Sequence, residues 1–243
     1  MTKVATKAFV VAAEKLLETE QASMPVTLEE LKEDPYVKAY IAQADKHMEA
    51  IGFTEHGFRH ADLVSHIAMN VLKRLGYPER EAELAGMAGY LHDIGNSVGR
   101  SFHAVSAAMM AQSIFTRLGM APEEMILAMN AIGNHEEEYG MATSPIGAAV
   151  ILADKTDVHR SRVRTPNPLT TDIHDRVNLA AQRSFLKVDE DRKLIELEID
   201  TDTNISQVME YFEIFLSRMV ICRRAAEFLG CQFGLVINGV KLL

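Results

Sequence analysis

The sequence has few of the residues that mark secreted or nucleic-acid-coating proteins. Only two cysteines, Cys222 and Cys231, occur among 243 residues. They are too few for a disulfide framework, which favours a reducing, cytoplasmic location. Basic residues are also in deficit, because 25 Lys and Arg stand against 34 Asp and Glu and the net charge is −9. Proteins that follow nucleic-acid phosphates carry a positive field, so we expect no nucleic-acid partner.

Long apolar runs are missing as well. A signal peptide or a membrane-spanning helix needs an uninterrupted apolar stretch, and Lys7, Glu14 and Lys15 interrupt the apolar face of residues 4–20. We therefore expect no membrane partner. With 48% apolar and 24% charged residues, the chain has the composition of a soluble globular protein that can bury a full core.

The first two thirds of the chain are predicted to be a helical body. Apolar residues recur there at spacings of three and four, and Gly or Pro separates the segments. Ser144 followed by Pro145 is typical of a helix start. The predicted helices cover residues 4–20, 35–51, 56–75, 79–94, 103–118, 122–137 and 145–157.

After Arg164 the pattern changes. Residues 165–168 contain two prolines, which disfavour helix in the residues before them. The remainder is predicted to contain a helix at 172–183, strands at 185–188 and 194–199, a long helix at 206–229 and a strand at 232–238. The fold expected is mostly α, with a helical domain over residues 1–164 and a small β-β-α-β appendage over residues 165–243. We expect this appendage to pack on the helical body, although its strands could instead join a second copy in a homodimer.

Six ionisable side chains lie on apolar helix faces, namely those of His60, His92, Asp93, His103, His135 and Asp154. Burying an unpaired carboxylate costs at least several kcal/mol, so six independent burials would cancel roughly the whole net stability of about 5–15 kcal/mol. Taken singly, each histidine could be a core residue bonded to a carbonyl, and Asp154 could pair with Arg160 or Arg162. Taken together, they indicate one or two divalent cations. Imidazole with carboxylate suits Fe, Mn, Zn, Co or Ni.

The order of these residues resembles the HD-domain superfamily of metal-dependent phosphohydrolases. The resemblance extends over residues 55–160 and rests on His60, the run Leu91-His92-Asp93-Ile94-Gly95, His103, His135 and Asp154. It implies a helical bundle with the metal site at its centre. It also implies that His60, His92, Asp93 and Asp154 ligate one metal, and that His103 and His135 complete a second metal site, with Asp93 bridging.

Two departures from the family pattern are visible. His103 follows Asp93 by only 10 residues, which is closer than in many relatives and makes it the least secure ligand. Asn96 stands where a lysine is usual, and no GYP signature follows, so the cyclic-di-GMP subgroup is not supported.

The reaction implied is the cleavage of a phosphoester of a nucleotide or another small phosphorylated metabolite by metal-activated hydroxide. Two metals about 3.5–4 Å apart would also clamp the phosphoryl oxygens. Asp93 and Lys155 are the expected catalytic residues, and the expected substrate-binding residues are Arg59, Arg160, Arg164 and His56. The arginines could equally be solvated cations at a helix end. Glu136 and Glu137 could orient a ligand or carry protons.

Two other functions stay open. Some relatives use the same six ligands in a di-iron centre that activates oxygen, so an HD-type oxygenase is one alternative. A non-catalytic regulatory protein that keeps its metal as a structural element is the other, although the intact ligand set speaks against it.

Overall fold

The computed structural model describes residues 25–164 and 173–243 of the chain. The helical part contains α2 (Leu28–Glu33), α3 (Pro35–Ala50), α4 (Phe58–Arg74), α5 (Glu79–Leu91), α6 (His103–Leu118), α7 (Pro122–Gly133) and α8 (Pro145–Lys155), with short 3-10 helices at Ile94–Ser97 (η1) and Arg160–Arg162 (η2). The C-terminal part contains α9 (Ile173–Ala180), β1 (Ala181–Asp189), β2 (Leu194–Thr201), α10 (Val208–Phe228), β3 (Gln232–Ile237) and β4 (Val240–Lys241).

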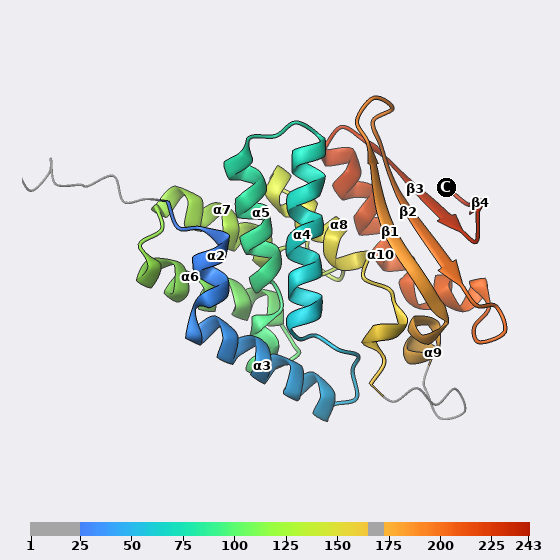
Figure 1. Ribbon diagram of the computed structural model, residues 1–243, viewed down its shortest axis with the longest axis horizontal. Helices are drawn as coiled ribbons and strands as arrows, with labels where there is room; N and C mark the ends of the chain where they lie inside the picture. The colour runs from blue at the N-terminus through green and yellow to red at the C-terminus, as the bar shows by residue number, and fades with distance from the viewer. Residues whose placement is uncertain (1–24, 165–172) are drawn as a thin grey trace, which may run out of the picture.

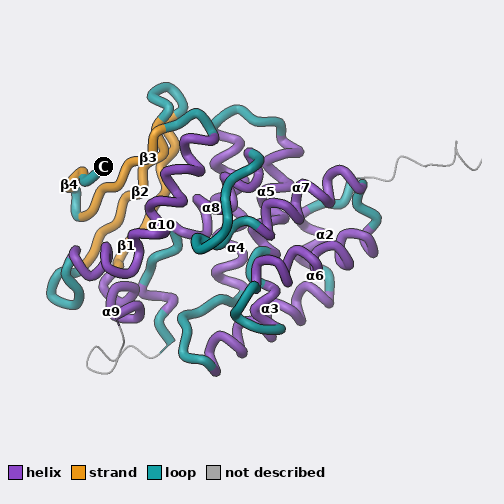
Figure 2. The backbone as a smooth tube through the Cα atoms, turned by 180° about the vertical axis from the view of Figure 1, so that it is seen from behind, coloured by secondary structure: helices purple, strands orange, loops and turns teal. Residues whose placement is uncertain are grey.

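Helix α8 is the centre of the molecule. It contacts α4, α5 and α7 on the side of the helical body and α10 on the other side, as Figures 1 and 2 show from opposite directions. A helix surrounded in this way has to be apolar on every face, and all residues from Ile146 to Ala153 are buried. The Ser144 hydroxyl accepts a hydrogen bond from the Gly147 amide, 3.1 Å away, which confirms the predicted helix start.

The C-terminal sheet has the strand order β1-β2-β3-β4. Strands β1 and β2 form an antiparallel hairpin, whereas β2 and β3 are parallel and connected through α10. Helix α10 lies between the sheet and α8 (Figure 1). Ile195, Leu197 and Ile199 are buried while Glu196 and Glu198 are more exposed, as their alternation predicts. The appendage therefore packs on the helical body, as expected, and both cysteines are free and buried.

The fold class is confirmed, and the differences lie at the ends of elements. The expected helices at 79–94 and 122–137 end at Leu91 and Gly133. The expected helix at 172–183 ends at Ala180, because β1 begins at Ala181 and pairs with β2. Helix α2, stabilised by a capping box between Thr27 and Glu30, was not predicted. Strand β4 was also missed.

Two predicted segments, the helix over 4–20 and the loop over 165–168, lie outside the described residues. The division of the chain at residue 164 stays a prediction. None of the helices within residues 25–164 and 173–243 is both long and apolar enough to cross a bilayer.

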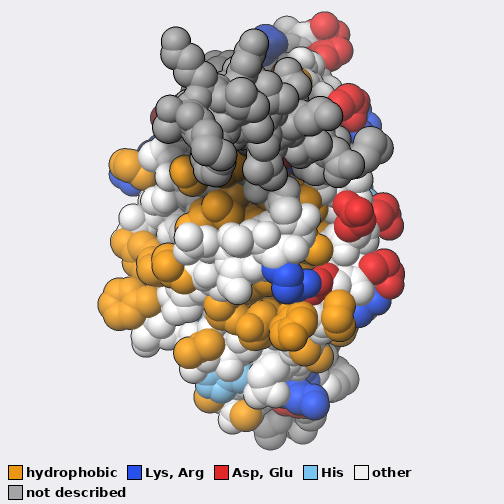
Figure 3. All heavy atoms as spheres, turned by 90° about the vertical axis from the view of Figure 1, so that its left-hand side faces the viewer, with side chains coloured by type: hydrophobic (Ala, Val, Ile, Leu, Met, Phe, Trp, Pro, Cys, Tyr) orange, Lys and Arg blue, Asp and Glu red, His pale blue; other side chains and the backbone are white. Residues whose placement is uncertain are grey.

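Apolar side chains gather on the outer face of the helical body that Figure 3 shows. On α6 and α7 the exposed apolar residues include Val105, Met109, Ile126 and Leu127. Patches of this kind are typical of contact surfaces, while the homodimer expected from the sequence stays a prediction.

Candidate metal centre

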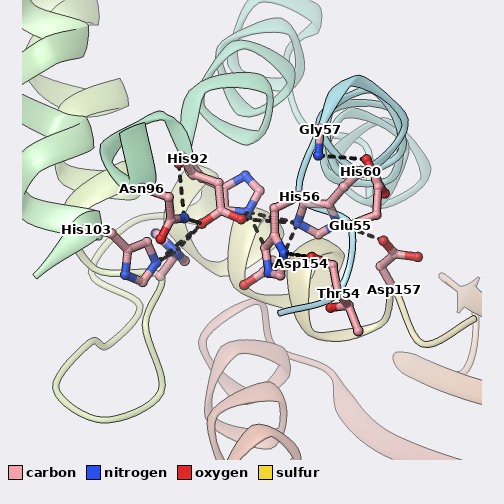
Figure 4. A network of polar contacts seen from close by, with 12 residues as sticks. Thr54, Glu55, His56, Gly57, His60, His92, Asn96, His103, Asp154 and Asp157 are labelled. Carbon is pink, nitrogen blue, oxygen red and sulfur yellow. Dashed lines mark hydrogen bonds and ion pairs between the residues drawn. The ribbon is translucent and has the colours of Figure 1, made fainter. Parts of the chain in front are cut away.

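The six predicted ligands come from five helices, and each lies at or near a helix end. His60 is in the first turn of α4, Asp154 in the last turn of α8, and His103 is the first residue of α6. His92 and Asp93 directly follow α5, and His135 follows α7. The four imidazoles are at most 2% exposed. Figure 4 shows several of these side chains pointing toward one another.

The chain reverses direction just after Asp93, and Gly95 makes this reversal possible. A Cβ atom at Gly95 would lie 2.0 Å from the carbonyl oxygen of His103, so only glycine lets α6 begin this close to η1. Asn96 holds the turn, because its amide nitrogen donates to the Asp93 carboxylate at 2.9 Å. The spacing of 10 residues between Asp93 and His103 is thus explained by a tight reversal that brings the two residues together.

The imidazoles form two pairs through their Nε2 atoms. His60 Nε2 is 3.2 Å from His92 Nε2, and His103 Nε2 is 3.2 Å from His135 Nε2. Metal–nitrogen bonds of about 2.0–2.1 Å place two ligands of one ion about 2.9–3.4 Å apart. The observed separations therefore fit two ligands that share a cation.

The other nitrogen of each ring, Nδ1, contacts an oxygen. For His92 and His135 the oxygen is the carbonyl of Gly89 or Ile132, at 2.7 Å in both cases. For His103 it is the carbonyl of Arg100, at 3.1 Å, and for His60 it is a carboxylate described below. A carbonyl can only accept, so Nδ1 carries the proton there and Nε2 presents a lone pair. This is the tautomer that metal binding through Nε2 requires.

The carboxylate of Asp93 lies between the two pairs. Its Oδ2 is 3.6 Å from His60 Nε2 and 3.4 Å from His92 Nε2. Its Oδ1 is 3.3 Å from His103 Nε2 and 3.9 Å from His135 Nε2. One oxygen of Asp93 thus faces each pair.

Asp154 faces only the first pair, with its Oδ1 3.5 Å from His60 Nε2 and 3.6 Å from His92 Nε2. Sets of three donor atoms within 4.8 Å of one another, such as His60, His92 and Asp154, are able to hold a cation.

The electrostatics of the site require positive charge. Burial raises the pKa of Asp93 and Asp154, but neighbouring cationic and hydrogen-bonding groups outweigh it and hold both pKa values well below the ordinary value. Burial lowers the pKa of His92, but Asp93 and Asp154 outweigh it and raise that pKa to about 10. Burial and the charge of His92 lower the pKa of His135 to about 3. The carboxylates thus draw a cation to the first histidine pair, in the form of either a proton or a metal ion.

Residues 57–159 match the family model described as the HD domain. This segment is therefore similar to the HD domain. An uncharacterized protein of Methanocaldococcus jannaschii, MJ1020, is 29% identical over 184 residues, which cover 66% of this chain and 70% of that protein. The family consists largely of metal-dependent phosphohydrolases, and its members bind divalent metals. The match includes all six predicted ligands, so the resemblance stated from the sequence is confirmed.

Outside the six, the HD domain contains a buried carboxylate that orients His60. The Asp157 Oδ2 accepts a hydrogen bond from His60 Nδ1 at 2.7 Å and from Arg59 Nη2 at 2.7 Å. Burial raises the pKa of Asp157, but Arg162 and the His60 contact outweigh it, and the pKa lies below its ordinary value. A carboxylate behind a ligating histidine fixes the ring and increases its basicity. Sequence reasoning missed Asp157, although it follows Asp154 by three residues.

Lys155 is enclosed by carboxylates. Its Nζ lies 2.7 Å from Asp154 Oδ2, 2.5 Å from Glu137 Oε2 and 3.8 Å from Glu136 Oε1. Burial lowers the pKa of Lys155, but these carboxylates outweigh it and raise the pKa above its ordinary value. Arg218 of α10 extends the network, with its Nε donating to Glu137 Oε1 at 3.2 Å. Lys155 is therefore a permanent cation directed at Asp154.

A cavity of about 350 Å³ lies beside the HD-domain site, between the helical body and the C-terminal module. Its polar lining includes the basic side chains of His56, Arg100, Arg162, His174 and Arg218. Its apolar lining includes Ile51, Phe53, Ile214 and Phe215. Residues of α9 and α10 thus form one wall. A larger cavity of about 490 Å³ lies between α4 and β1. None of the six predicted ligands lines either cavity, but Arg100 of the smaller one lies 3.2 Å from the Nε2 of His103. The smaller cavity is therefore the candidate substrate site.

The predicted substrate-binding residues have different positions. Of the four, only His56 is among the described residues that line the smaller cavity. Its ring centroid is 5.5 Å from that of His60, and burial keeps its pKa well below the ordinary value. Arg59 pairs with Glu55 and Asp157, and Arg164 Nη2 is 2.5 Å from Asp45 Oδ1. Arg160 is exposed on η2.

Two arginines that line the cavity, Arg100 and Arg218, were not singled out from the sequence. Arg100 lies three residues before His103, and its Nη1 is 3.2 Å from His103 Nε2. Arg218 had a detectable signal, because it is the one charged residue between Phe215 and Cys222, a stretch of α10 that is otherwise apolar except for Ser217.

Proposed function

We propose that the protein is a metal-dependent phosphohydrolase with two metals per chain, which cleaves a phosphoester of a nucleotide or another small phosphorylated metabolite. The observation that carries this proposal is the position of Asp93, whose two carboxylate oxygens face different histidine pairs. A carboxylate in this position would be able to serve two adjacent cations at once, as two-metal hydrolases require.

The first metal would be held by His60, His92 and Asp154, and the second by His103 and His135. One oxygen of Asp93 would serve each. Mixed imidazole and carboxylate donors suit Mn, Fe, Zn, Co or Ni. When bound, such a pair lowers the pKa of a water molecule and polarises the phosphoryl oxygens of the substrate.

Cationic side chains at the cavity support a phosphorylated substrate. Arg100 lies beside His103, and Arg218 approaches from α10. Guanidinium groups bind phosphate oxygens through paired, charge-assisted hydrogen bonds. His56 is neutral at physiological pH, because burial depresses its pKa, so it would contribute a hydrogen bond rather than a charge. The rings of Phe53 and Phe215 offer an apolar surface for the organic part of the substrate.

Lys155 would act on Asp154 rather than on the substrate. Its ammonium group already contacts Asp154 and Glu137 at 2.7 and 2.5 Å, and its side chain is only 6% exposed. A cation bound in this way fixes the orientation of a ligating carboxylate. Lys155 is thus a positioning residue in this proposal, and Asp93 is the catalytic residue.

The proposal is tested by purifying the protein without chelators, counting its metals, and assaying hydrolysis of p-nitrophenyl phosphate, bis(p-nitrophenyl) phosphate and nucleoside monophosphates with Mn²⁺. We expect two metal equivalents per chain and hydrolysis that EDTA abolishes. Asp93→Asn is expected to lose hydrolysis by at least a hundredfold, whereas Asp62→Asn, at a half-exposed position of α4, is the matched control.

Other outcomes would select the alternatives. Iron content with oxygen consumption and no phosphate release would identify an oxygenase. Tightly bound metal without either reaction would contradict the proposal and favour a structural role.

A further inference from the structure

Glu136 is a buried carboxylate directed at the second histidine pair. It directly follows His135, and its side chain is only 8% exposed. Its Oε2 is 3.3 Å from His103 Nε2, the same distance that separates Asp93 Oδ1 from that nitrogen. Donor atoms of His103, His135 and Glu136 all lie within 4.8 Å of one another. Glu136 therefore occupies the position of a further ligand.

Glu136 would make the two metal positions equivalent. The first position has two imidazoles, one oxygen of Asp93 and a carboxylate of its own, that of Asp154. The second has two imidazoles and the other oxygen of Asp93, and lacks a carboxylate of its own unless Glu136 supplies it.

The charges lead to the same assignment. Two divalent ions carry +4, and Asp93 and Asp154 together offset only −2. A third carboxylate reduces the excess positive charge of this buried site, where uncompensated charge is costly.

Lys155 supports the same arrangement. Its Nζ lies 2.7 Å from Asp154 Oδ2 and 3.8 Å from Glu136 Oε1. These are the carboxylate oxygens that do not face the histidines. One buried ammonium group thus contacts the outer oxygens of both carboxylates and would hold their inner oxygens toward the two metal positions.

Arg100 is the competing partner of Glu136. Its Nη2 lies 3.5 Å from Glu136 Oε2, which is longer than a good charge-assisted hydrogen bond. The Arg100 side chain is 34% exposed, against 8% for Glu136. The contacts of Glu136 with the partly exposed Arg100 and with Lys155 are both long, at 3.5 and 3.8 Å, and compensate a buried carboxylate poorly. A directly bound cation would compensate it well.

We propose that Glu136 is a direct ligand of the second metal, so that each metal has two histidines, one carboxylate of its own and one oxygen of Asp93. This inference rests on the dinuclear centre proposed above. It assigns a seventh protein ligand that the six-residue pattern does not contain.

The test compares metal binding by the wild type and Glu136→Gln, with Glu138→Gln as the matched control, because Glu138 is the exposed neighbour. Metal-free proteins are titrated with Mn²⁺ in a calorimeter, and bound metal is counted after dialysis. We expect two ions in the wild type and in E138Q. E136Q should keep one tight ion and bind the second at least tenfold more weakly. Co²⁺ absorption should show a changed spectrum for the second ion only.

Further variants separate the possible roles of Glu136. Arg100→Gln should leave metal affinity within about twofold of the wild type, since Arg100 is not a ligand. Glu136→Asp keeps the charge on a shorter side chain. Its affinity for the second ion should lie between those of the wild type and E136Q. This variant provides a second measurement if E136Q folds poorly. Thermal unfolding of the metal-free proteins checks that each variant folds.

The outcomes distinguish the two proposals. Two ions bound by E136Q with wild-type affinity would overturn the role of Glu136 and leave the dinuclear centre intact. Loss of affinity in R100Q equal to that in E136Q would also overturn it, because Glu136 would then act through Arg100. Fewer than two ions in the wild type would overturn the dinuclear centre itself, and this inference with it.

Discussion

At the scale of single residues, Gly95 and Asp157 control the candidate centre without belonging to the predicted ligand set. Gly95 allows η1 and α6 to touch, and Asp157 holds the far side of the His60 ring. Both act by fixing where a histidine points. Ligand geometry within a few tenths of an ångström decides metal affinity, so such residues matter as much as some ligands.

Gly95→Ala is expected to destabilise the protein by about 1–3 kcal/mol, as overpacking does, because the new methyl group would lie 2.0 Å from the backbone oxygen of His103. Backbone cannot move aside as a side-chain end can, so His103 should shift and the second ion should bind more weakly. Urea unfolding and a Mn²⁺ titration measure the two effects. Gly99→Ala is the control, since nothing lies within 4 Å of a Cβ atom there. Equal stability of the two variants would contradict this explanation of the tight reversal.

Asp157→Asn is expected to weaken the binding of the first metal ion by about 10–100-fold. This is the usual loss of affinity when a carboxylate that hydrogen-bonds a ligating histidine is removed. The amide removes the negative charge that faces His60 and leaves Arg59 with one carboxylate partner fewer. Calorimetric titration with Mn²⁺ checks the affinity, and Asp62→Asn in the same helix serves as the control. An affinity unchanged within twofold would show that Asp157 has no influence on the centre.

At the scale of secondary-structure elements, α10 connects the two parts of the chain. Its first turn is held by a capping box in which Glu210 faces Gln207, and Glu210 Oε1 also accepts from Arg176 Nη2 of α9 at 2.6 Å. Arg218, in the middle of α10, lines the cavity. A loss of order in the first turn of α10 would therefore affect its contact with α9.

Glu210 is expected to make the stability of α10 sensitive to acid. Hydrogen bonds from Arg176 and Ser206 lower the pKa of Glu210 from its ordinary 4.5 to about 2. Because the folded pKa lies below the unfolded one, the stabilisation is complete above about pH 4.5 and is lost as the pH falls toward 2. Glu210→Gln should thus be less stable than the wild type at pH 7, and the difference should shrink between pH 5 and pH 3. Urea midpoints across this range measure it, with exposed Glu227→Gln as the control. A difference independent of pH would contradict the assignment.

At the scale of the whole molecule, the candidate substrate cavity belongs to both parts of the chain. The HD domain contributes Arg100 and Glu137, while α9 and α10 contribute His174, Arg218 and the apolar side chains of Ile214 and Phe215. The C-terminal module is thus more than an appendage on the helical body. Its helices complete the enclosure from which water would have to be excluded for efficient charge stabilisation.

Arg218→Gln is expected to raise KM for a phosphomonoester about tenfold, as the loss of one charge-assisted hydrogen bond predicts. Its metal content should not change, because Arg218 contacts Glu137 and none of the predicted ligands. Steady-state kinetics with Mn²⁺ and a metal count measure both. Arg223→Gln, at an exposed position of α10, is the control. An unchanged KM would remove Arg218 from substrate binding.

Much of the fold could be predicted because its signals are local. Ser144 and Pro145 start α8 as expected, and the alternation of Ile195, Leu197 and Ile199 identifies β2. The errors occur where contacts between segments far apart in the sequence decide the secondary structure. Residues 181–183 have a helical pattern, yet they join β1 because β2 offers a partner. Strand β4 is too short to leave a pattern of its own.

The candidate site shows the same division. Periodicity alone identified six costly side chains on apolar faces, since a polar group in such a place is detectable within one helix. Arg164 and Asp45, by contrast, are 119 residues apart in the chain, and no local pattern indicates that they form an ion pair. The same holds for Asp157 behind His60 and for Arg218 beside Glu137.

By itself, the sequence determined the helical class, the C-terminal strands and helix, the resemblance to the HD family and the cluster of ionisable residues on apolar faces, because periodicity, capping and motif order are properties of short segments. Only the tertiary structure decided which oxygen of Asp93 faces which histidine pair, that Glu136 lies beside His103 and Asp157 beside His60, and which arginines reach the cavity. These depend on distances between segments far apart in the chain, and those distances are set by the packing of α4, α5, α6 and α10 around α8.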